Sequence, residues 1–189
     1  RATIAKEKGL EPLANLILLQ KMTETPLEEA KNYINPEKEV STAEDALNGA
    51  KDILAESVSD NADFRTHIRE LTMKHGQLLS AAKDPEAESV YEMYYEFSES
   101  LSKLAGHRIL AISRGEKEKF LTVKIDAPVD RILSYLDRKL ITAPSAPTAA
   151  VLHEVTEDAY NRLIAPAIER EIRNLSLIHI SEPTRLALI

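Results

Sequence analysis

Two short stretches carry the side-chain signals that begin α-helices. Thr25-Pro26-Leu27-Glu28 places a capping hydroxyl before a proline at the first helical position, with a glutamate three residues after the cap. Ser41-Thr42-Ala43-Glu44 repeats this capping box, and apolar residues then recur at steps of three and four as far as Leu54. The second pattern predicts a one-sided helix that ends near Glu56. Five glycines and 5% aromatic residues also favour a helical protein over a barrel or a sandwich.

Further helices are predicted along the rest of the chain. Their start signals are Glu11-Pro12, Asp60, Asp84-Pro85 and Pro128, and their stop signals include Gly9 and Gly76. The helix that starts at Asp84-Pro85 is expected to carry Tyr91, Tyr94 and Tyr95. From Ala149 to Asn174 an apolar stripe predicts one long helix, kinked where Pro166 interrupts it.

One segment has the period of a strand. From Phe120 to Ile125 apolar and polar residues alternate. Because a lone short strand needs a partner, Leu78 to Ala82 is the candidate. The sequence therefore predicts an all-α fold, an irregular multi-helix domain with at most one short β pair and a long kinked C-terminal helix.

Both ends of the chain carry features that we expect to be foreign or truncated. Leu175 to Arg185 looks like the translation of an adapter used in DNA sequencing libraries, so residues 175–189 are expected to be an artefact that contributes nothing to the fold. The chain begins at Arg1 without a methionine, and we expect it to be an internal piece of a longer protein. Residues 1–142 are expected to form one helical domain and residues 143–174 the long helix after it.

The residues of common catalytic and metal sites are missing or wrongly spaced. Cysteine is absent, which excludes disulfides and thiolate chemistry. His67, His75, His107 and His153 do not have the spacing of zinc ligands. No nucleophile elbow, phosphate-binding glycine loop or dinucleotide fingerprint occurs. We therefore expect no enzyme activity, no metal and no cofactor, and the lack of a run of about 18 apolar residues predicts no membrane span.

Positive charge gathers in one stretch of an otherwise acidic chain. Between Leu101 and Ile125 there are six Lys or Arg residues against two acids, whereas the whole chain has a net charge of -7. Because Lys and Arg neutralise phosphates, these six are the candidate nucleic-acid-binding residues: Lys103, Arg108, Arg114, Lys117, Lys119 and Lys124. Glu116 and Glu118 interrupt them. The alternative is that Arg108 and Arg114 pair with acids inside the fragment.

Two other groups have a structural interpretation beside a functional one. Tyr91, Tyr94, Tyr95 and Phe97 have rings on which bases can stack, but at helical spacing such residues usually form core with solvated hydroxyl groups. Between Lys21 and Asp63 eleven acids face four lysines, which is typical of a solvated acidic helix face.

A series of short motifs also runs through the chain in the order found in one protein family. They are Gly9 to Ala14, Asn35 to Lys38, Gly49 to Glu56, Tyr95 to Ser98, His107 to Ala111 with Arg114 to Glu118, Leu121 to Val123, and Ile168 to Asn174. Over residues 1–174 the chain resembles the N-terminal helical region of the Tex proteins, which are RNA-binding bacterial transcription accessory factors. Two features depart from the family: its members often have a small residue at the position of Lys119, and Ser80 to Ser89 matches poorly.

The resemblance implies a cytoplasmic, transcription-linked parent protein built from several modules. An RNase-H-like domain, helix-hairpin-helix motifs and an RNA-binding OB-fold would follow residue 174. Residues 1–174 would act as its helical scaffold, and the expected partners are RNA or DNA, bound mainly by those other modules, and RNA polymerase or other transcription proteins. The alternative is a protein-protein interaction scaffold that uses the acidic face between Glu24 and Asp63 and makes no direct nucleic-acid contact.

Overall fold

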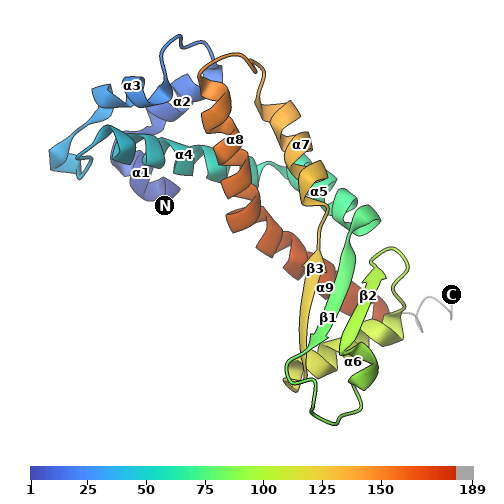
Figure 1. The fold of residues 1–189 in the computed structure, drawn as a ribbon. Helices are drawn as coiled ribbons and strands as arrows, with labels where there is room; N and C mark the ends of the chain where they lie inside the picture. The colour runs from blue at the N-terminus through green and yellow to red at the C-terminus, as the bar shows by residue number, and fades with distance from the viewer. Residues whose placement is uncertain (182–189) are drawn as a thin grey trace. The chain divides into compact units, whose positions relative to one another are not determined.

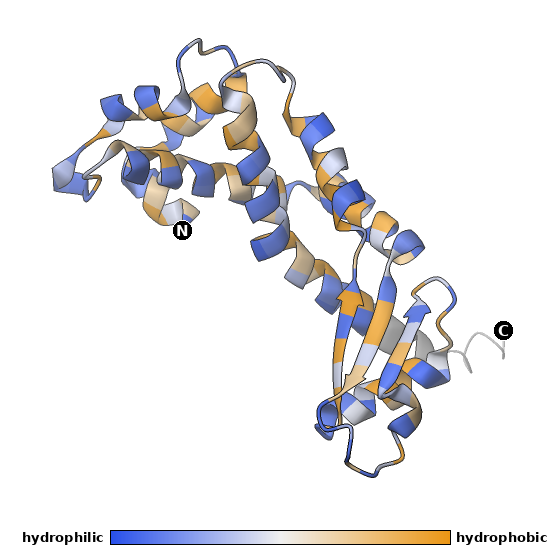
Figure 2. Ribbon diagram, in the orientation of Figure 1, coloured by the Kyte–Doolittle hydropathy of each residue, from blue (hydrophilic) through white to orange (hydrophobic). Residues whose placement is uncertain are grey.

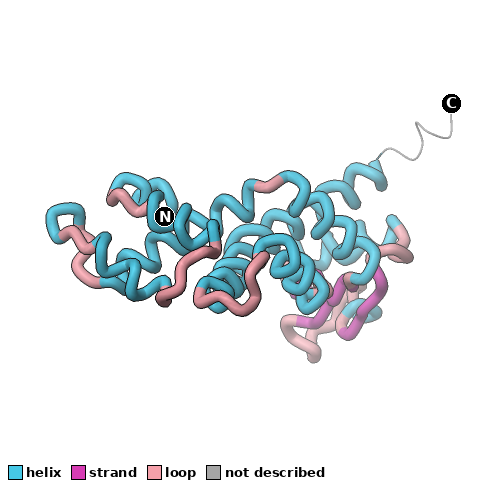
Figure 3. Tube along the Cα trace, turned by 90° about the horizontal axis from the view of Figure 1, so that it is seen from above, coloured by secondary structure: helices cyan, strands magenta, loops and turns pink. Residues whose placement is uncertain are grey.

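The computed structural model describes the backbone of residues 1–181 and the side chains of residues 1–174. Helices make up most of it (Figures 1 and 3). They are α1 (Ala2–Glu7), α2 (Glu11–Leu19), α3 (Pro26–Ala30), α4 (Ala43–Asp60), α5 (Ala62–His75), α6 (Gly106–Lys117), α7 (Val129–Leu140), α8 (Thr148–Asp158) and α9 (Ala165–Ser181). The strands are β1 (Gln77–Ala82), β2 (Glu96–Ser100) and β3 (Leu121–Asp126). The expected artefact, residues 175–189, lies outside the described side chains, and residues 182–189 lie outside the described residues.

The chain folds into two compact units. Unit 1 comprises residues 1–65 and 130–166, and unit 2 comprises residues 66–129 and the chain from 167 onward. Each unit has its own apolar core, and Figure 2 shows hydrophobic residues along the helices and strands of both. Fully buried side chains include Leu10, Leu13, Ile17, Ile132, Leu136 and Leu152 in unit 1 and Ile68, Ile112, Leu121 and Ile172 in unit 2. The expected domain boundaries at residues 142 and 174 stay predictions.

Helix α4 is the centre of unit 1, where α1, α2, α3 and α8 pack against it (Figure 1). It begins as predicted, because Oγ1 of Thr42 accepts a hydrogen bond from the N–H of Asp45 at 3.1 Å. It runs to Asp60, a turn beyond the predicted end at Glu56, and Val58 continues its buried face. The cap of α3 is also confirmed, since Oγ1 of Thr25 accepts from the N–H of Glu28.

The cap of α5 lies one residue later than predicted. Asp60 is still part of α4, whereas Oδ1 of Asn61 accepts a hydrogen bond from the N–H of Phe64 at 3.0 Å. Asn61 therefore caps α5, since its side-chain oxygen satisfies an N–H that has no partner within the helix. The predicted stop before Gly76 is confirmed by the end of α5 at His75.

A buried glutamine joins the end of α2 to the end of α7 inside unit 1. Gln20 has a left-handed backbone, with φ 58°, and is 8% exposed. Its Nε2 donates to the carbonyl of Leu140 at 2.9 Å, and its Oε1 accepts from the N–H of Thr142 at 2.8 Å. Gln20 thereby satisfies a carbonyl that the end of α7 leaves without a helical partner.

The predicted long C-terminal helix is irregular just before Pro166. Helix α8 passes through a π-helical segment, Ala159–Ile164, into α9. The wide turn adds a residue to the helical repeat, so the buried stripe moves from the predicted Leu163 and Ala167 to Ile164 and Ile168. Because Pro166 has no N–H, the regular hydrogen-bond ladder is interrupted there, and the π-helical segment lies at this interruption.

Unit 2 contains a three-stranded antiparallel sheet in the order β2-β1-β3. The predicted strand β3 and its predicted partner β1 are confirmed. The sheet is larger than the expected single β pair, because Glu96–Ser100 adds the edge strand β2. Leu78 and Val123 are buried on its inner face, where they line a small cavity together with Ile112 of α6 and Ile172 of α9. Helices α6 and α9 therefore cover one face of the sheet.

The predicted helix from Asp84-Pro85 through Tyr95 is wrong. The structure has a loop, a short 3-10 turn at Glu92–Tyr94 and then β2. In β2 the residues from Glu96 to Ser98 alternate between exposed and partly covered, which is the period of a strand. Residues of β1 hold the backbone of the tyrosine segment instead: the hydroxyl of Ser80 donates to the carbonyl of Tyr94 at 2.8 Å, and the N–H of Ala82 donates to that of Tyr95 at 2.9 Å. Such contacts depend on neighbours that a local pattern does not contain.

Candidate nucleic-acid interface

The basic run forms helix α6, the turn after it and strand β3. Ile112 and Gly115 of α6 face the core of unit 2. Its outer side presents residues that recur at steps of three and four and are all exposed: His107, Leu110, Arg114 and Lys117. Lys119 follows in the turn and is exposed as well. We call Arg114, Lys117 and Lys119 the α6 basic surface.

Lys119 has a conformation that is unusual for its residue type. Its φ is 67°, its N–H donates to the carbonyl of Glu116 at 3.1 Å, and the N–H of Phe120 donates to the carbonyl of Gly115 at 2.9 Å. These two hydrogen bonds form a Schellman ending, in which the left-handed position usually belongs to glycine. This backbone favours glycine, the smallest residue, at the position of Lys119.

The two acids that interrupt the basic run both have partners. Glu116 forms an ion pair with Arg173 of α9, and Glu118 accepts a hydrogen bond from the hydroxyl of Tyr91. Arg173 offsets the charge of Glu116, whereas neutral Tyr91 leaves the charge of Glu118 in place. The hydrogen bond to Glu118 raises the pKa of Tyr91, because the carboxylate favours the protonated hydroxyl that donates to it. Sequence reasoning missed Arg173, since no local pattern links residues 57 positions apart.

Arg108 forms an ion pair within unit 2. Its Nη1 lies 3.1 Å from Oε2 of Glu99 on β2, and its guanidinium carbon lies 5.7 Å from the ring centroid of Phe97. Arg108 thus fits the alternative in which an arginine of the basic run pairs with an acid of the fragment. Among the described side chains, no acid lies within ion-pair distance of the α6 basic surface.

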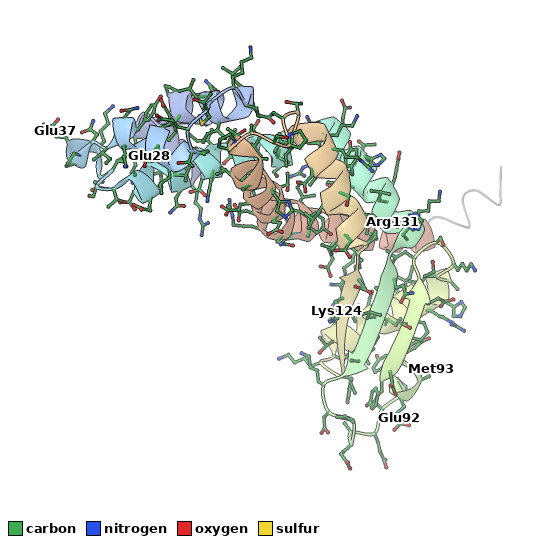
Figure 4. All side chains as sticks on the ribbon, turned by 45° about the horizontal axis from the view of Figure 1, so that its top comes forward. Glu28, Glu37, Glu92, Met93, Lys124 and Arg131 are labelled. Atoms are coloured by element: carbon green, nitrogen blue, oxygen red, sulfur yellow. The ribbon has the colours of Figure 1, made fainter. Side chains whose placement is uncertain are left out.

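The remaining two candidates lie apart from the α6 basic surface. Lys124 is exposed on β3, on the sheet face opposite the one that α6 covers; Figure 4 labels its position. Lys103 is exposed in the segment between β2 and α6. The structure therefore groups three of the six predicted residues and separates the other three.

The tyrosine rings agree with the structural interpretation of the sequence. Tyr91 and Tyr94 are buried, and their ring centroids lie 5.8 Å from that of Phe120 and 5.3 Å from that of Phe97, respectively. The hydroxyl of Tyr95 donates to the carbonyl of Ala87 at 2.6 Å. The buried rings of Tyr91 and Tyr94 stabilise unit 2 and do not offer a free face to a base.

A second polar cluster links α7 to α8 in unit 1. Nδ1 of His153 lies 2.7 Å from Oδ2 of Asp137, and its Nε2 lies 2.9 Å from Oε1 of Glu157. The hydroxyl of Thr156 donates to the other oxygen of Asp137 at 2.6 Å. The hydrogen bond to Asp137, with the negative charges of Asp137 and Glu157, raises the pKa of His153. The cluster therefore holds two helices together through a histidine that is charged over a wider pH range.

Within the described side chains, no group of three or more histidine, aspartate and glutamate residues is placed to hold a metal ion. The helices of the same part of the chain do not combine the length and the apolar character that crossing a bilayer requires.

Comparison with known proteins gives one family. Residues 21–176 match a family model described as Tex central region-like. The chain is 49% identical over 176 residues to the uncharacterized protein YdcI of Bacillus subtilis, which covers 92% of this chain and 24% of that protein. It is 35% identical over 188 residues to Protein tex of Bordetella pertussis, which covers 91% of this chain and 24% of that protein.

A more distant relative is the transcription elongation factor SPT6 homolog of Arabidopsis thaliana. The chain is 28% identical to it over 171 residues, covering 83% of this chain and 10% of that protein. The chain thus spans about a quarter or less of the length of these relatives.

Proposed function

The chain belongs to the Tex family, with a Tex central region-like domain, and on that premise we propose that it is the helical scaffold of a transcription accessory protein. In this proposal the scaffold also contacts nucleic-acid phosphates through the α6 basic surface. Its work is non-enzymatic and needs no cofactor. A relative named as a transcription elongation factor supports the link to transcription, and the resemblance to RNA-binding Tex proteins supports RNA as the nucleic acid.

One observation carries the nucleic-acid part of the proposal. Arg114 and Lys117 share the exposed side of α6, and Lys119 extends the same positive charge into the turn. The charge of Glu116, which lies between them in the sequence, is offset by Arg173. The local field on the outer side of α6 is therefore more positive than the sequence alone suggests, and positive surfaces attract phosphates.

With only three cations, this surface is expected to bind nucleic acid weakly. The affinity for a single-stranded nucleic acid that contacts all three should fall with salt at a log-log slope of about -2, which is about 16-fold between 50 and 200 mM. Dissociation constants are expected at about 10⁻⁴ to 10⁻⁶ M or weaker, with little sequence preference. Higher affinity in the parent protein then depends on its other modules.

The alternative function is a scaffold for protein partners without nucleic-acid contact. The observation that favours it is the acidic stretch from Glu24 to Asp63, in which most carboxylates are exposed in unit 1. Lys31 pairs with Glu28 at 2.9 Å, but both side chains are more than half exposed, so this pair contributes little. Such a surface repels phosphates and suits a basic protein partner.

Fluorescence anisotropy with a short single-stranded RNA, at two salt concentrations, tests the proposal. The variant combines Arg114→Gln, Lys117→Gln and Lys119→Gln, which remove charge and keep a β-carbon at every position. The matched control combines Lys21→Gln, Lys74→Gln and Lys139→Gln, which remove the same charge from exposed lysines elsewhere. A melting curve of each variant checks that the fold is kept.

The expected result is that the α6 variant binds RNA at least about tenfold more weakly and loses most of the salt dependence, whereas the control keeps both. Equal losses in the two variants would mean that only net charge matters. No RNA binding by the unmodified chain at low salt would reject the phosphate contact and favour the protein scaffold.

A further inference from the structure

The loop between β1 and β2 presents two apolar side chains to solvent. Val90 is 85% exposed and Met93 is 70% exposed, the highest fractions among the large apolar residues that the structure describes. Figure 4 labels Met93 and its neighbour Glu92 near the start of β2. A single exposed apolar side chain is ordinary, but two that lie three residues apart in one loop, flanked by polar residues in the sequence, indicate an interaction site.

The exposure of Val90 and Met93 does not come from a loose loop. Between and beside them, Tyr91 and Tyr94 are buried, at 7% and 5% exposed. The hydroxyl of Tyr95 bonds to the carbonyl of Ala87 at 2.6 Å, which fastens the middle of the loop to the start of β2. Since the tyrosines turn inward, Val90 and Met93 turn outward on an anchored backbone. A pre-ordered loop loses less conformational entropy when it binds a partner.

The charge around the two apolar residues selects the kind of partner. The exposed acids of the segment are Asp84, Glu86, Glu88, Glu92 and Glu96, and its one exposed cation is Lys83. Within the described side chains none of the five carboxylates has an ion-pair partner. Phosphates are repelled by such a surface, whereas lysine and arginine are attracted to it.

We propose that Val90 and Met93, together with the exposed acids of the same segment, form a docking site for a protein surface that has an apolar recess bordered by lysines and arginines. The two apolar side chains fill the recess, and the acids pair with the basic rim and steer the approach. This site does not depend on phosphate binding at the α6 basic surface, and its test leaves that surface unchanged.

Methionine-methyl NMR reports on the site in the intact chain. The chain has three methionines, so ¹³C-methyl labelling gives one signal from Met93 and internal controls from Met22 and Met73. The probe is a short synthetic peptide in which lysines surround two leucines, and a second peptide has serine in place of both leucines. We expect the first peptide to shift and broaden the Met93 signal alone, and the second to shift it much less.

Variants separate the apolar contact from the charge. Val90→Ser should weaken binding of the leucine peptide by about fivefold or more, and Val129→Ser, at an exposed valine elsewhere in unit 2, serves as its control. Glu86→Gln, Glu88→Gln and Glu92→Gln together should weaken it by about tenfold at low salt. The control for charge combines Glu24→Gln, Glu37→Gln and Glu44→Gln, which are exposed acids of unit 1 and should leave binding unchanged.

Three outcomes would overturn the proposal. One is equal shifts of all three methionine signals, which would indicate nonspecific adsorption of the peptide. Another is binding that Val90→Ser and Val129→Ser weaken alike. The third is a Met93 signal that responds to single-stranded RNA and not to the leucine peptide, which would assign the loop to nucleic acid.

Discussion

Gly115 of α6 and Leu121 of β3 lie so close that a β-carbon at position 115 would be 2.5 Å from Cδ1 of Leu121. The same β-carbon would be 3.1 Å from Cδ1 of Tyr91. Leu121 is fully buried, so its side chain has little room to move away. The glycine within the motif Arg114 to Glu118 therefore has a packing reason, because it lets α6 approach the sheet.

The variant Gly115→Ala should lower the free energy of unfolding by about 1 to 2 kcal/mol. Alanine gains about 1 kcal/mol of helix propensity, but overpacking against a buried leucine and a buried ring costs about 1 to 3 kcal/mol or more. Urea unfolding measures the difference. Leu121→Val in the same chain should recover part of the loss, as coupled neighbours do. A Gly115→Ala chain as stable as the original would mean that α6 shifts without cost.

The variant Lys119→Gly should raise the stability of unit 2 by about 1 kcal/mol. Lys119 has φ 67°, where a β-carbon costs about 1 to 2 kcal/mol. Part of this gain in stability is cancelled, because glycine also has more conformational freedom in the unfolded chain. Lys119→Ala keeps the β-carbon and should leave stability nearly unchanged. Thermal melts of both variants separate backbone strain from charge, and equal gains in the two would point to charge instead.

The variant Gln20→Ala should cost about 1 to 3 kcal/mol. It removes the amide that donates to the carbonyl of Leu140 and accepts from the N–H of Thr142, and a buried group without its partner loses about that much. Gln20→Gly makes the same deletion but relieves the left-handed backbone at φ 58°, so it should cost less than Gln20→Ala. Urea unfolding with exposed Gln77→Ala as a control tests this order. A loss no greater than that of the control would contradict it.

The His153 cluster should make unit 1 less stable as pH rises. Its partners Asp137 and Glu157 raise the pKa of His153 in the folded chain above the value of 6.5 in the unfolded chain. The stabilisation that protonated His153 gives the folded chain is therefore complete below about pH 6.5, and it is lost as pH rises through the pKa of His153 in the folded chain. The effect should be small, because the His153 side chain is 47% exposed and solvent screens the pairs.

An NMR titration of His153 measures the shift directly, and Asp137→Asn should move its pKa back down. The melting temperature of the unmodified chain should fall more between about pH 6 and about pH 8 than that of His153→Gln. The same decline in both chains would show that another group titrates.

Which parts of the fold were predictable depends on how far apart the interacting residues are. The caps at Thr25 and Thr42 were predictable, because each capping hydrogen bond joins residues three positions apart. The alternation of buried and exposed residues in β3 was also predictable, since side chains of a strand point to opposite faces in turn. The region of Tyr91 to Tyr95 was not predictable, because its spacing suits a helix, whereas Ser80 and Ala82 of β1 donate hydrogen bonds to the carbonyls of Tyr94 and Tyr95, and no local pattern contains these partners.

By itself the sequence determined where the capped helices α3 and α4 begin, that one face of α4 is apolar and that six cations gather in one stretch, because these properties belong to neighbouring residues. Only the tertiary structure decided which of those cations are available to a partner. Glu99 of β2 holds Arg108, the pleat of β3 places Lys124 on the opposite face of the sheet, and Arg173 offsets Glu116 beside the α6 basic surface. The physical reason is that a sequence shows only the sum of the charges in each stretch. The electric field at a surface depends instead on the distant charged groups that packing brings within a few ångströms of it.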